Sequence, residues 1–468
     1  MTTDPVVQLE HEAVVIGGGL AGLTAARELL RHGVKPLVLE ASQRVGGYLS
    51  PLKIALDPGH EITVDAGAES FAARDVEVAD YIAGLGLDVV QPSPRSAWCF
   101  PSSGAPFPLP KTSVLGVPSD WTDPALAAAL GAEGVERARA DEWMNVAIGD
   151  RSNLAAFVAS RMGQDVVERL VRPIAGGVHS ADPGKLDVTA LHPRFWEIFE
   201  SAGSLTEAVR EIRAAAPAGS AVSGIRGGMN QLVSTLAEQI SGLGGNIAYG
   251  KAVSGLARAG NGWKVTIEGL HGDSSAIVTP RVVLALPAAQ ATYLLEQVGI
   301  GAVENARDIP PGSDISLVTL VVDAAQLADR GTGGLIAPGG AISAKGTTHV
   351  NSKWPWVQEL LPEHTHVIRF SYGRHGEPAD QSDQELIAQA RADFERIYEP
   401  LTYTVHTAHV QRWPNALAPV TPQMKALSTA VAEQVDGLPG LAVTGAWMSG
   451  TGVVAVIPYT RKAVLGIV

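Results

Sequence analysis

Three glycines near the start of the chain have the spacing of a phosphate-binding turn. Gly17, Gly19 and Gly22 form a GxGxxG pattern directly after the apolar run Ala13–Ile16. In such a turn the first glycine permits a tight bend, the second lets backbone approach a pyrophosphate, and the third lets helix and strand pack closely. Free N–H groups at the start of the next helix attract the phosphates. The pattern therefore predicts a dinucleotide site.

The segments around these glycines fit a strand–helix–strand unit. Apolar residues at helical spacing follow the turn: Leu23, Ala26, Leu29 and Leu30. Gly33 ends this pattern, and the apolar run 37–39 predicts a second buried strand that closes at Glu40, an acid suited to accept hydrogen bonds from ribose hydroxyls. The alternative is a glycine-rich turn that binds nothing. The predicted dinucleotide contacts here are Gly17, Gly18, Gly19, Leu20, Ala21, Gly22, Glu40 and Ala41.

The stretch PSPRSAWCFPSSGAPFPLP, residues 92–110, contains two further reactive residue types. Arg95 lies in an apolar, proline-rich setting, where an unpaired cation is costly. Two partners are open: a ligand carboxylate, gripped through two N–H groups, or an internal Asp or Glu. Cys99, the single cysteine of the chain, lies between Trp98 and Phe100 with no basic neighbour that would lower its pKa. We expect Cys99 to fill space in the core.

Composition excludes several function classes. The 468 residues carry a net charge of −13, which argues against nucleic acid and means that an anionic ligand needs local cations. One cysteine excludes an internal disulfide and a thiolate metal cluster, and we expect no metal. No apolar run is long enough to span a membrane, and the acidic start MTTDPVVQLEHE does not resemble a signal peptide. We therefore expect a cytoplasmic protein, with peripheral membrane contact left open.

The segments after Glu40 resemble the flavin amine oxidase superfamily. The similarity lies in ASQRVGG (41–47), VDAGAESF (64–71), the stretch 221–254, VVLALP (282–287) and the C-terminal stretch 441–463. It implies FAD, and we expect non-covalent binding because Cys99 does not resemble the SGGC motif of the covalent-flavin amine oxidases. It also implies a helix that begins after Gly452 and directs its N–H groups at the flavin, although proline at position 458 is unfavourable inside a helix. The implied further FAD contacts are Arg44, Gly46, Gly47, Gly67, Ala68, Glu69, Ser70, Val253, Trp413, Gly445, Gly452, Val453 and Val454.

Within that superfamily the chain resembles the oxygen-dependent porphyrinogen oxidases, and most closely the Gram-positive type that forms coproporphyrin. GGVHSADPGKLDVTALHPRFWEIFESAGSL (176–205), PSPR (92–95) and KGTTHVNSKW (345–354) carry this similarity, whereas 450–458 departs from the family pattern. It implies six-electron oxidation of coproporphyrinogen III to coproporphyrin III by O₂ in haem biosynthesis, with H₂O₂ released. A protoporphyrinogen IX oxidase and, less well supported, an amine oxidase are the alternatives. The partners implied are the tetrapyrrole, O₂ and a downstream ferrochelatase.

The resemblance also implies cations for the substrate propionates. Arg95, Lys345 and Lys353 are the predicted substrate contacts. Lys345, Lys353 and a further cation, Arg369, are expected to lie in the substrate sheet, and solvated sheet edges are the alternative for these three. His179 and His349 are open either as bases or as ordinary polar residues, and no catalytic residue is named because the flavin performs the hydride step.

The predicted fold is α/β: a Rossmann-like FAD-binding domain of the flavin amine oxidase superfamily, with an inserted mixed-sheet substrate domain and a helical subdomain. The FAD-binding domain is expected to be discontinuous, over residues 1–88, 221–300 and 405–468. The substrate-binding domain is expected over 89–110, 200–220 and 301–404, and the helical subdomain over 111–199.

Overall fold

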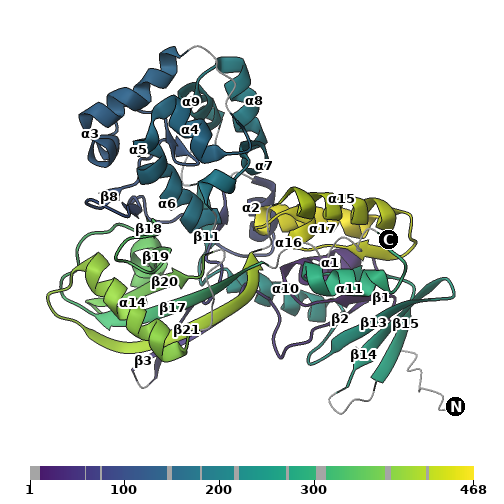
Figure 1. The fold of residues 1–468 in the computed structure, drawn as a ribbon. Coiled ribbons are helices and arrows are strands. Elements are labelled where there is room, and N and C mark those ends of the chain that lie inside the picture. The colour runs from purple at the N-terminus through teal and green to yellow at the C-terminus, as the bar shows by residue number, and fades with distance from the viewer. Residues whose placement is uncertain are drawn as a thin grey trace. The chain divides into compact units, whose positions relative to one another are not determined.

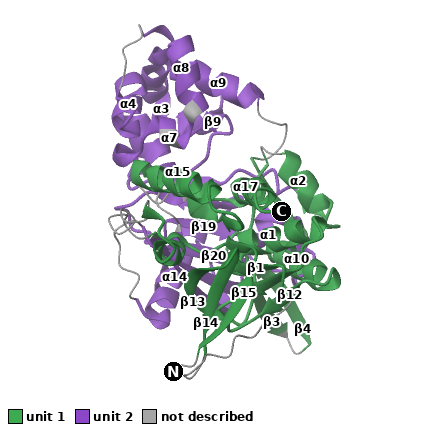
Figure 2. Cartoon of the chain, turned by 90° about the vertical axis from the view of Figure 1, so that its right-hand side faces the viewer, with its two compact units in different colours: residues 1–90, 221–312, 417–468 green, residues 91–220, 313–416 purple. Residues whose placement is uncertain are grey.

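The computed structural model divides the chain into two compact units, coloured separately in Figure 2. Unit 1 spans residues 1–90, 221–312 and 417–468, and unit 2 spans 91–220 and 313–416. The structure describes residues 11–57, 59–73, 76–144, 150–179, 182–215, 221–269, 274–301, 312–374, 381–417 and 421–468. The predicted helical segment 111–199 belongs to unit 2, as do residues 405–416. Which ligand each part binds stays a prediction.

Unit 1 is built on a five-stranded parallel sheet in the order β12-β2-β1-β16-β22. Its strands are β1 (Ala13–Ile16), β2 (Pro36–Leu39), β12 (Asn246–Ala248), β16 (Val282–Leu284) and β22 (Leu441–Val443). The five strands come from three separate segments of the chain: β1 and β2 from the first, β12 and β16 from the second, and β22 from the third. The predicted strand–helix–strand unit is confirmed, because α1 (Leu20–Arg31) connects the parallel strands β1 and β2.

Alternating side chains of β1 enter two different cores. Ala13 and Val15 pack with residues of three helices: α1, α10 (Asn230–Gly242) and α17 (Val453–Leu465). Val14 and Ile16 face the other side of the sheet, which is covered by a three-stranded antiparallel sheet and two helices. That layer contains β13 (Ala252–Ala259), β14 (Gly262–Glu268), β15 (Ser274–Thr279), α11 (Ala288–Glu296) and α15 (Pro422–Asp436) (Figure 1). A strand buried on both faces explains the continuous apolar run of β1.

Smaller elements complete unit 1. They are β3 (Pro51–Asp57), β4 (His60–Asp65), β5 (Phe71–Ala72), α2 (Val76–Ala83), β6 (Val89–Val90), β11 (Val222–Ile225) and α16 (Ala446–Ser449). Asp65, at the end of β4, accepts hydrogen bonds from the backbone N–H groups of Met229 and Asn230. This carboxylate caps the start of α10 and ties two distant segments together.

Unit 2 contains a seven-stranded mixed sheet in the order β21-β17-β20-β19-β18-β7-β8. The strands are β7 (Trp98–Phe100), β8 (Phe107–Pro108), β17 (Ser313–Asp323), β18 (Gly333–Ile336), β19 (Gly346–His349), β20 (Thr365–Tyr372) and β21 (Thr404–Leu417). Helix α14 (Asp383–Tyr398) packs Phe394 and Ile397 onto apolar residues of β17 and β20 (Figure 1). Two short helices, α12 (Val350–Lys353) and α13 (Pro355–Gln358), follow β19.

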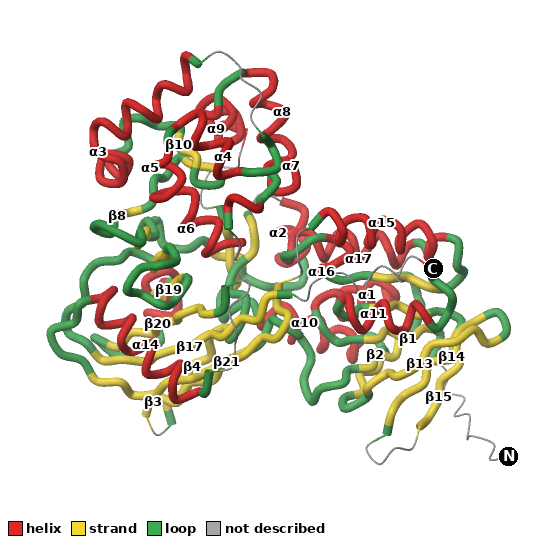
Figure 3. Tube along the Cα trace, in the orientation of Figure 1, coloured by secondary structure: helices red, strands yellow, loops and turns green. Residues whose placement is uncertain are grey.

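The remainder of unit 2 is mainly helical (Figure 3). Its main helices are α3 (Pro124–Arg139), α4 (Leu154–Met162), α7 (Val188–Leu191), α8 (Pro193–Ala202) and α9 (Leu205–Ala215), and residues 164–179 form a further helical stretch. The buried Arg161 guanidinium donates to Asp141, whose other carboxylate oxygen accepts from Ser204 and Thr206. Arg161 also donates to the carbonyl oxygens of Asp141 and Gly203, and these hydrogen bonds offset much of the cost of burying the ion pair.

Candidate functional site

The turn between β1 and α1 can be built only from glycine at two positions. Gly17 has φ +103°, and a Cβ there would lie 2.4 Å from the carbonyl oxygen of Ala285. A Cβ on Gly22 would lie 1.8 Å from the carbonyl oxygen of Gly17. Any side chain at either position would displace backbone, which fits the tight bend predicted at Gly17 and the close packing predicted at Gly22. Their contact with a dinucleotide stays a prediction.

Helix α1 begins at a glycine with free space beside its Cα. Gly19 is the N-cap residue, and no side chain caps the helix. A Cβ added to Gly19 would meet no atom within 4 Å. The first N–H groups of a helix have no partner inside the helix and carry partial positive charge, so this end can hold an anionic group. Leu20 and Ala21 form the first turn of the helix, and their contact with a dinucleotide stays a prediction.

Glu40 is fixed beside this turn by its own carboxylate. Its Oε2 accepts a hydrogen bond of 2.8 Å from the N–H of Gly18, and its Oε1 accepts one of 2.8 Å from the N–H of Ser42. The Glu40 backbone is tied to β12 and to Lys251. Because each carboxylate oxygen can accept a second hydrogen bond, Glu40 can still accept hydrogen bonds from ribose hydroxyls next to the glycine turn.

The Gly46–Gly47 loop lies against the same turn. The N–H of Gly46 donates to the carbonyl oxygen of Gly18 at 2.8 Å, and a Cβ on Gly46 would lie 2.5 Å from the carbonyl oxygen of Leu49. The exposed guanidinium of Arg44 donates to the carbonyl oxygen of Gly47 at 3.0 Å. Backbone geometry therefore requires glycine at position 46, and Arg44 is held beside the pair.

Two further predicted contact segments lie in unit 1. Val253 lines a cavity of about 280 Å³, together with Leu286, Ala289, Gln290, Tyr293 and Leu294 of the α11 region. The N–H of Lys251 donates to the carbonyl oxygen of Glu40, which fixes the start of β13 beside the acid. The loop with Gly67, Ala68, Glu69 and Ser70 connects β4 to β5, and the N–H of Ala68 donates to the carbonyl oxygen of Tyr48.

The C-terminal segment forms a second uncapped helix start. Gly445 and Gly452 have φ values of +128° and +103°, and Gly452 is the N-cap of α17 with no side-chain cap. Val453 and Val454 are buried in the core that α17 shares with α1. The predicted helix is confirmed, and it continues through Pro458, which lacks only the one N–H that would reach back one turn.

The unit 1 residues fit a dinucleotide cofactor of the flavin type. The side-chain-free turn, the uncapped helix start and the fixed acid supply the donors and acceptors that a diphosphate and a ribose require. Trp413 lies on β21 of unit 2, and its role as a cofactor contact stays a prediction.

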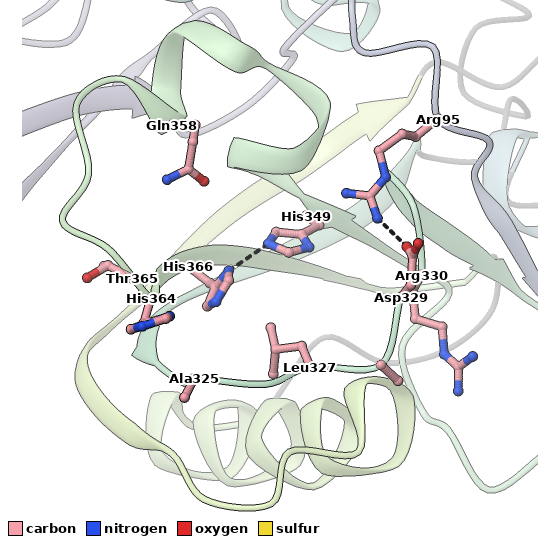
Figure 4. A pocket seen from close by; sticks show the side chains of 11 residues that line it. Arg95, Ala325, Leu327, Asp329, Arg330, His349, Gln358, His364, Thr365 and His366 are labelled. Carbon is pink, nitrogen blue, oxygen red and sulfur yellow. Dashed lines mark hydrogen bonds and ion pairs between the residues drawn. The ribbon is translucent and has the colours of Figure 1, made fainter.

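Unit 2 has a polar cavity of about 280 Å³ at one end of its sheet. Figure 4 shows the side chains that line it: Arg95, Ala325, Leu327, Ala328, Asp329, Arg330, His349, Gln358, His364, Thr365 and His366. The Nη2 of Arg95 forms an ion pair with Asp329, and its Nη1 donates to the Ser352 hydroxyl at 2.8 Å. Of the two partners left open for Arg95, the structure contains the internal carboxylate. Its role as a substrate contact stays a prediction.

Two histidines form a hydrogen-bonded pair at the cavity wall. The Nε2 of His349 lies 3.1 Å from the Nδ1 of His366, whose Nε2 lies 3.1 Å from the carbonyl oxygen of Ala324. The carbonyl accepts, so His366 carries its proton on Nε2 and His349 donates. Burial, with smaller contributions from His366 and Arg95, lowers the pKa of His349 to about 3. Both rings are neutral in this arrangement, so neither adds positive charge to the cavity.

The other cations predicted for the substrate sheet, Lys345, Lys353 and Arg369, do not line the cavity beside Arg95. Lys345 is buried directly before β19, and Arg369 is buried in β20. The prediction that Lys353 lies in the sheet is wrong: the strand ends at His349, and Lys353 closes the short helix α12, with its Nζ 5.3 Å from the Trp354 ring centroid. The chain leaves the sheet because the N–H of Trp354 bonds back to the carbonyl oxygen of Val350.

Cys99 is packing, as predicted. Its thiol is buried and donates to the carbonyl oxygen of Arg169 at 3.3 Å, and burial raises its pKa to about 12. A thiol held protonated in this way is a poor nucleophile. The side chain of His179 lies outside the described residues.

Sequence reasoning missed Asp329, Ser352 and His366. Asp329 and Ser352 are separated from Arg95 by 234 and 257 residues, and no spacing pattern connects them. Among the described residues no group of three His, Cys, Asp or Glu side chains could hold a metal ion. In the part of the chain that the structure describes, no helix is both long enough and apolar enough to cross a membrane.

Known proteins resemble this chain over nearly its full length. The family model of flavin-containing amine oxidoreductases matches residues 20–455. A coproporphyrinogen III oxidase of Mycobacterium leprae is 32% identical and covers 96% of each chain; one of Bacillus subtilis is 25% identical and covers 97% of each. A solved structure from Exiguobacterium sp. 255-15, provisionally named a protoporphyrinogen oxidase, has a TM-score of 0.81 at 22% identity and covers 98% of each chain.

Proposed function

Because the chain belongs to the family of flavin-containing amine oxidoreductases, we propose that it is an FAD-dependent coproporphyrinogen III oxidase of haem biosynthesis. The fold is that of the flavin amine oxidase superfamily, as predicted, and the chain is a flavin-dependent oxidoreductase. The observation that carries the substrate proposal is the 32% identity to a coproporphyrinogen III oxidase across both units.

The residues of unit 1 would bind FAD without a covalent bond. The uncapped start of α1 would hold the diphosphate, and Glu40 would accept from the ribose hydroxyls. The uncapped start of α17 would stabilise negative charge on the isoalloxazine. When bound, the flavin supplies a two-electron acceptor for a hydride from a bridging CH₂ group of the substrate.

The reaction removes six electrons and six hydrogens in three rounds. Its balance is one coproporphyrinogen III and three O₂ giving one coproporphyrin III and three H₂O₂. The protein's part is to orient the macrocycle and to exclude water. We assign no proton acceptor, since His349 is held neutral and has a pKa too low for an effective base at neutral pH.

We place the substrate carboxylates on unit 2, with Arg95, Lys345 and Lys353 as the proposed contacts. The cavity beside Arg95, at about 280 Å³, is smaller than the sites that enclose whole drug-sized ligands and suits one carboxylate arm. The proposal includes a cytoplasmic location and delivery of the product to a ferrochelatase.

The alternative substrate is protoporphyrinogen IX. A chloroplastic protoporphyrinogen oxidase of Spinacia oleracea is 26% identical and covers 94% of this chain. The test is to mix the purified flavin-loaded protein with either porphyrinogen in air, and to follow porphyrin fluorescence and H₂O₂. Faster turnover of coproporphyrinogen III supports the proposal, faster turnover of protoporphyrinogen IX selects the alternative, and no turnover of either contradicts both.

A further inference from the structure

The Arg95 guanidinium is held by two side chains that both bond to the backbone of one residue, Gly331. Its Nη2 pairs with Asp329, and its Nη1 donates to Ser352. The N–H of Gly331 donates to the Asp329 carboxylate at 2.8 Å, and the Ser352 hydroxyl donates to the carbonyl oxygen of Gly331 at 2.7 Å. Arg95, Asp329, Gly331 and Ser352 therefore close a ring of hydrogen bonds, which we call the Arg95 ring.

Backbone geometry fixes this ring in place. Gly331 has φ +56°, and a Cβ there would lie 1.8 Å from the carbonyl oxygen of Ser96, the residue after Arg95. The turn that carries Asp329 is thus packed against the segment that carries Arg95, just before β7. The orientation of the guanidinium is built into the fold before any ligand arrives.

The Arg95 ring leaves part of the guanidinium available. An arginine has five N–H donors, and the contacts to Asp329 and Ser352 use two. The Arg95 side chain is 47% exposed, and Figure 4 shows it at the edge of the cavity with the His349 ring beside the ion pair. A ligand carboxylate can therefore reach the outer donors while the inner ones stay occupied.

Each of the two arginines that line this cavity is paired with a carboxylate. Asp329 neutralises Arg95, and the Arg330 side chain turns away to Glu399 and to the carbonyl oxygen of Ile397. His349 and His366 are neutral in their hydrogen-bonded pair. A carboxylate that approaches Arg95 thus meets a cation whose charge another carboxylate already offsets, and the two carboxylates repel each other.

We propose that Asp329 determines how tightly this protein holds carboxylate-bearing tetrapyrroles: it orients Arg95 for a ligand carboxylate and at the same time weakens that contact. This inference rests on the proposed function and deepens it. A weaker contact speeds release of the product, which carries the same carboxylates as the substrate and must leave after oxidation. Asp329 is a specificity-determining residue in this account, and it touches Arg95 and not the reacting carbon.

The test compares Asp329→Asn with a matched control. Asparagine keeps an oxygen for the Gly331 N–H but removes the negative charge. Glu399→Gln removes one negative charge from the neighbouring Arg330 pair, where the carboxylate is similarly exposed, at 63% against 71% for Asp329. Each flavin-loaded protein is titrated with coproporphyrin III and, in parallel, with its tetramethyl ester, and binding is followed by porphyrin fluorescence.

Asp329→Asn should bind the free acid about 5-fold more tightly than the wild type, the size expected for exposed charge contacts. Neither its affinity for the ester nor the affinities of Glu399→Gln should change, and adding Arg95→Gln to Asp329→Asn should abolish the increase. If Asp329→Asn fails to fold, Asp329→Ser, which also keeps an acceptor for Gly331, gives the same comparison.

Unchanged or weaker binding of the free acid by the folded Asp329 variant overturns this inference. An equal increase for acid and ester, or for Glu399→Gln, also overturns it, because the effect would then not pass through the Arg95 carboxylate contact. Wild-type protein that turns over coproporphyrinogen III while Asp329→Asn shows no change leaves the proposed function intact. No binding and no turnover by any variant overturns both.

Discussion

The glycine turn of unit 1 and the Arg95 ring of unit 2 are two polar sites built in opposite ways. The turn presents backbone N–H groups, and side chains are excluded by contacts as close as 1.8 Å. The Arg95 ring is made of side chains that already satisfy one another. In the glycine turn, the backbone N–H groups can bond to any ligand that fits. In the Arg95 ring, a ligand must either use the remaining N–H donors of Arg95 or replace one of its internal partners.

The largest expected effect on stability comes from a substitution in the glycine turn. Gly22→Ala places a methyl group against the Gly17 carbonyl, so the strand–helix packing must shift, and we expect a loss of about 3 kcal/mol or more in the free energy of unfolding. Flavin content should fall with it. Denaturant unfolding and the flavin absorbance of the purified protein measure both.

Gly19→Ala is the matched control for that change. Its added methyl group meets no protein atom, so the variant should unfold like the wild type and lose only flavin affinity. If Gly22→Ala were as stable as Gly19→Ala, the close packing at the turn would not be what requires glycine.

Glu40→Gln should come next in size. The amide keeps one oxygen for Gly18 or Ser42 and presents an N–H group to the other, so we expect FAD to bind about 10- to 100-fold more weakly. Fluorescence titration of the flavin-free protein gives the dissociation constants. Glu61→Gln, at an exposed position of the same unit, should leave the dissociation constants unchanged. If Glu40→Gln bound FAD as tightly as the wild type, Glu40 would not be part of the FAD site.

Arg95→Lys tests whether the Arg95 guanidinium binds a substrate carboxylate. Lysine keeps the charge but cannot hold Asp329, Ser352 and a ligand carboxylate in one planar fork. We expect the KM for coproporphyrinogen III to rise about 10-fold with little change in kcat. A lower melting temperature with an unchanged KM would instead assign Arg95 a purely structural role, the alternative that the sequence leaves open.

The smallest expected effect concerns the histidine pair. The folded protein lowers the pKa of His349 to about 3, below the ordinary value of 6.5, so the unfolded chain binds this proton more tightly. Stability is therefore complete above pH 6.5 and falls as the pH drops toward 3, with a loss of about 1 kcal/mol between pH 7.5 and 5.5. His349→Gln should show a smaller loss over that interval in unfolding titrations, and an identical pH profile would contradict the assignment.

The difference between the two sites also explains what the sequence could predict. Gly17, Gly22 and Glu40 lie within one strand–helix–strand unit, where backbone geometry allows few residue types, so their pattern is visible along the chain. The same reasoning locates β22 and the start of α17, since Gly445 and Gly452 have positive φ values.

The partners of Arg95 could not be found in that way. Asp329 and Ser352 reach it only because β7, β18 and β19 are neighbours in one sheet, and any short polar residue at such positions looks ordinary in the sequence. Lys353 shows the same limit. Its segment KGTTHVNSKW (345–354) resembles a family strand, but the chain turns into α12 after His349.

The central claim is that flavin bound to this chain takes electrons from a porphyrinogen. The most direct test is to mix the flavin-loaded protein with coproporphyrinogen III in the absence of O₂ and to record the flavin absorbance in a stopped-flow instrument. The account predicts rapid bleaching of the flavin, and recovery of the absorbance with porphyrin formation when O₂ is admitted. Flavin that stays oxidised in the presence of excess coproporphyrinogen III and of excess protoporphyrinogen IX would contradict it.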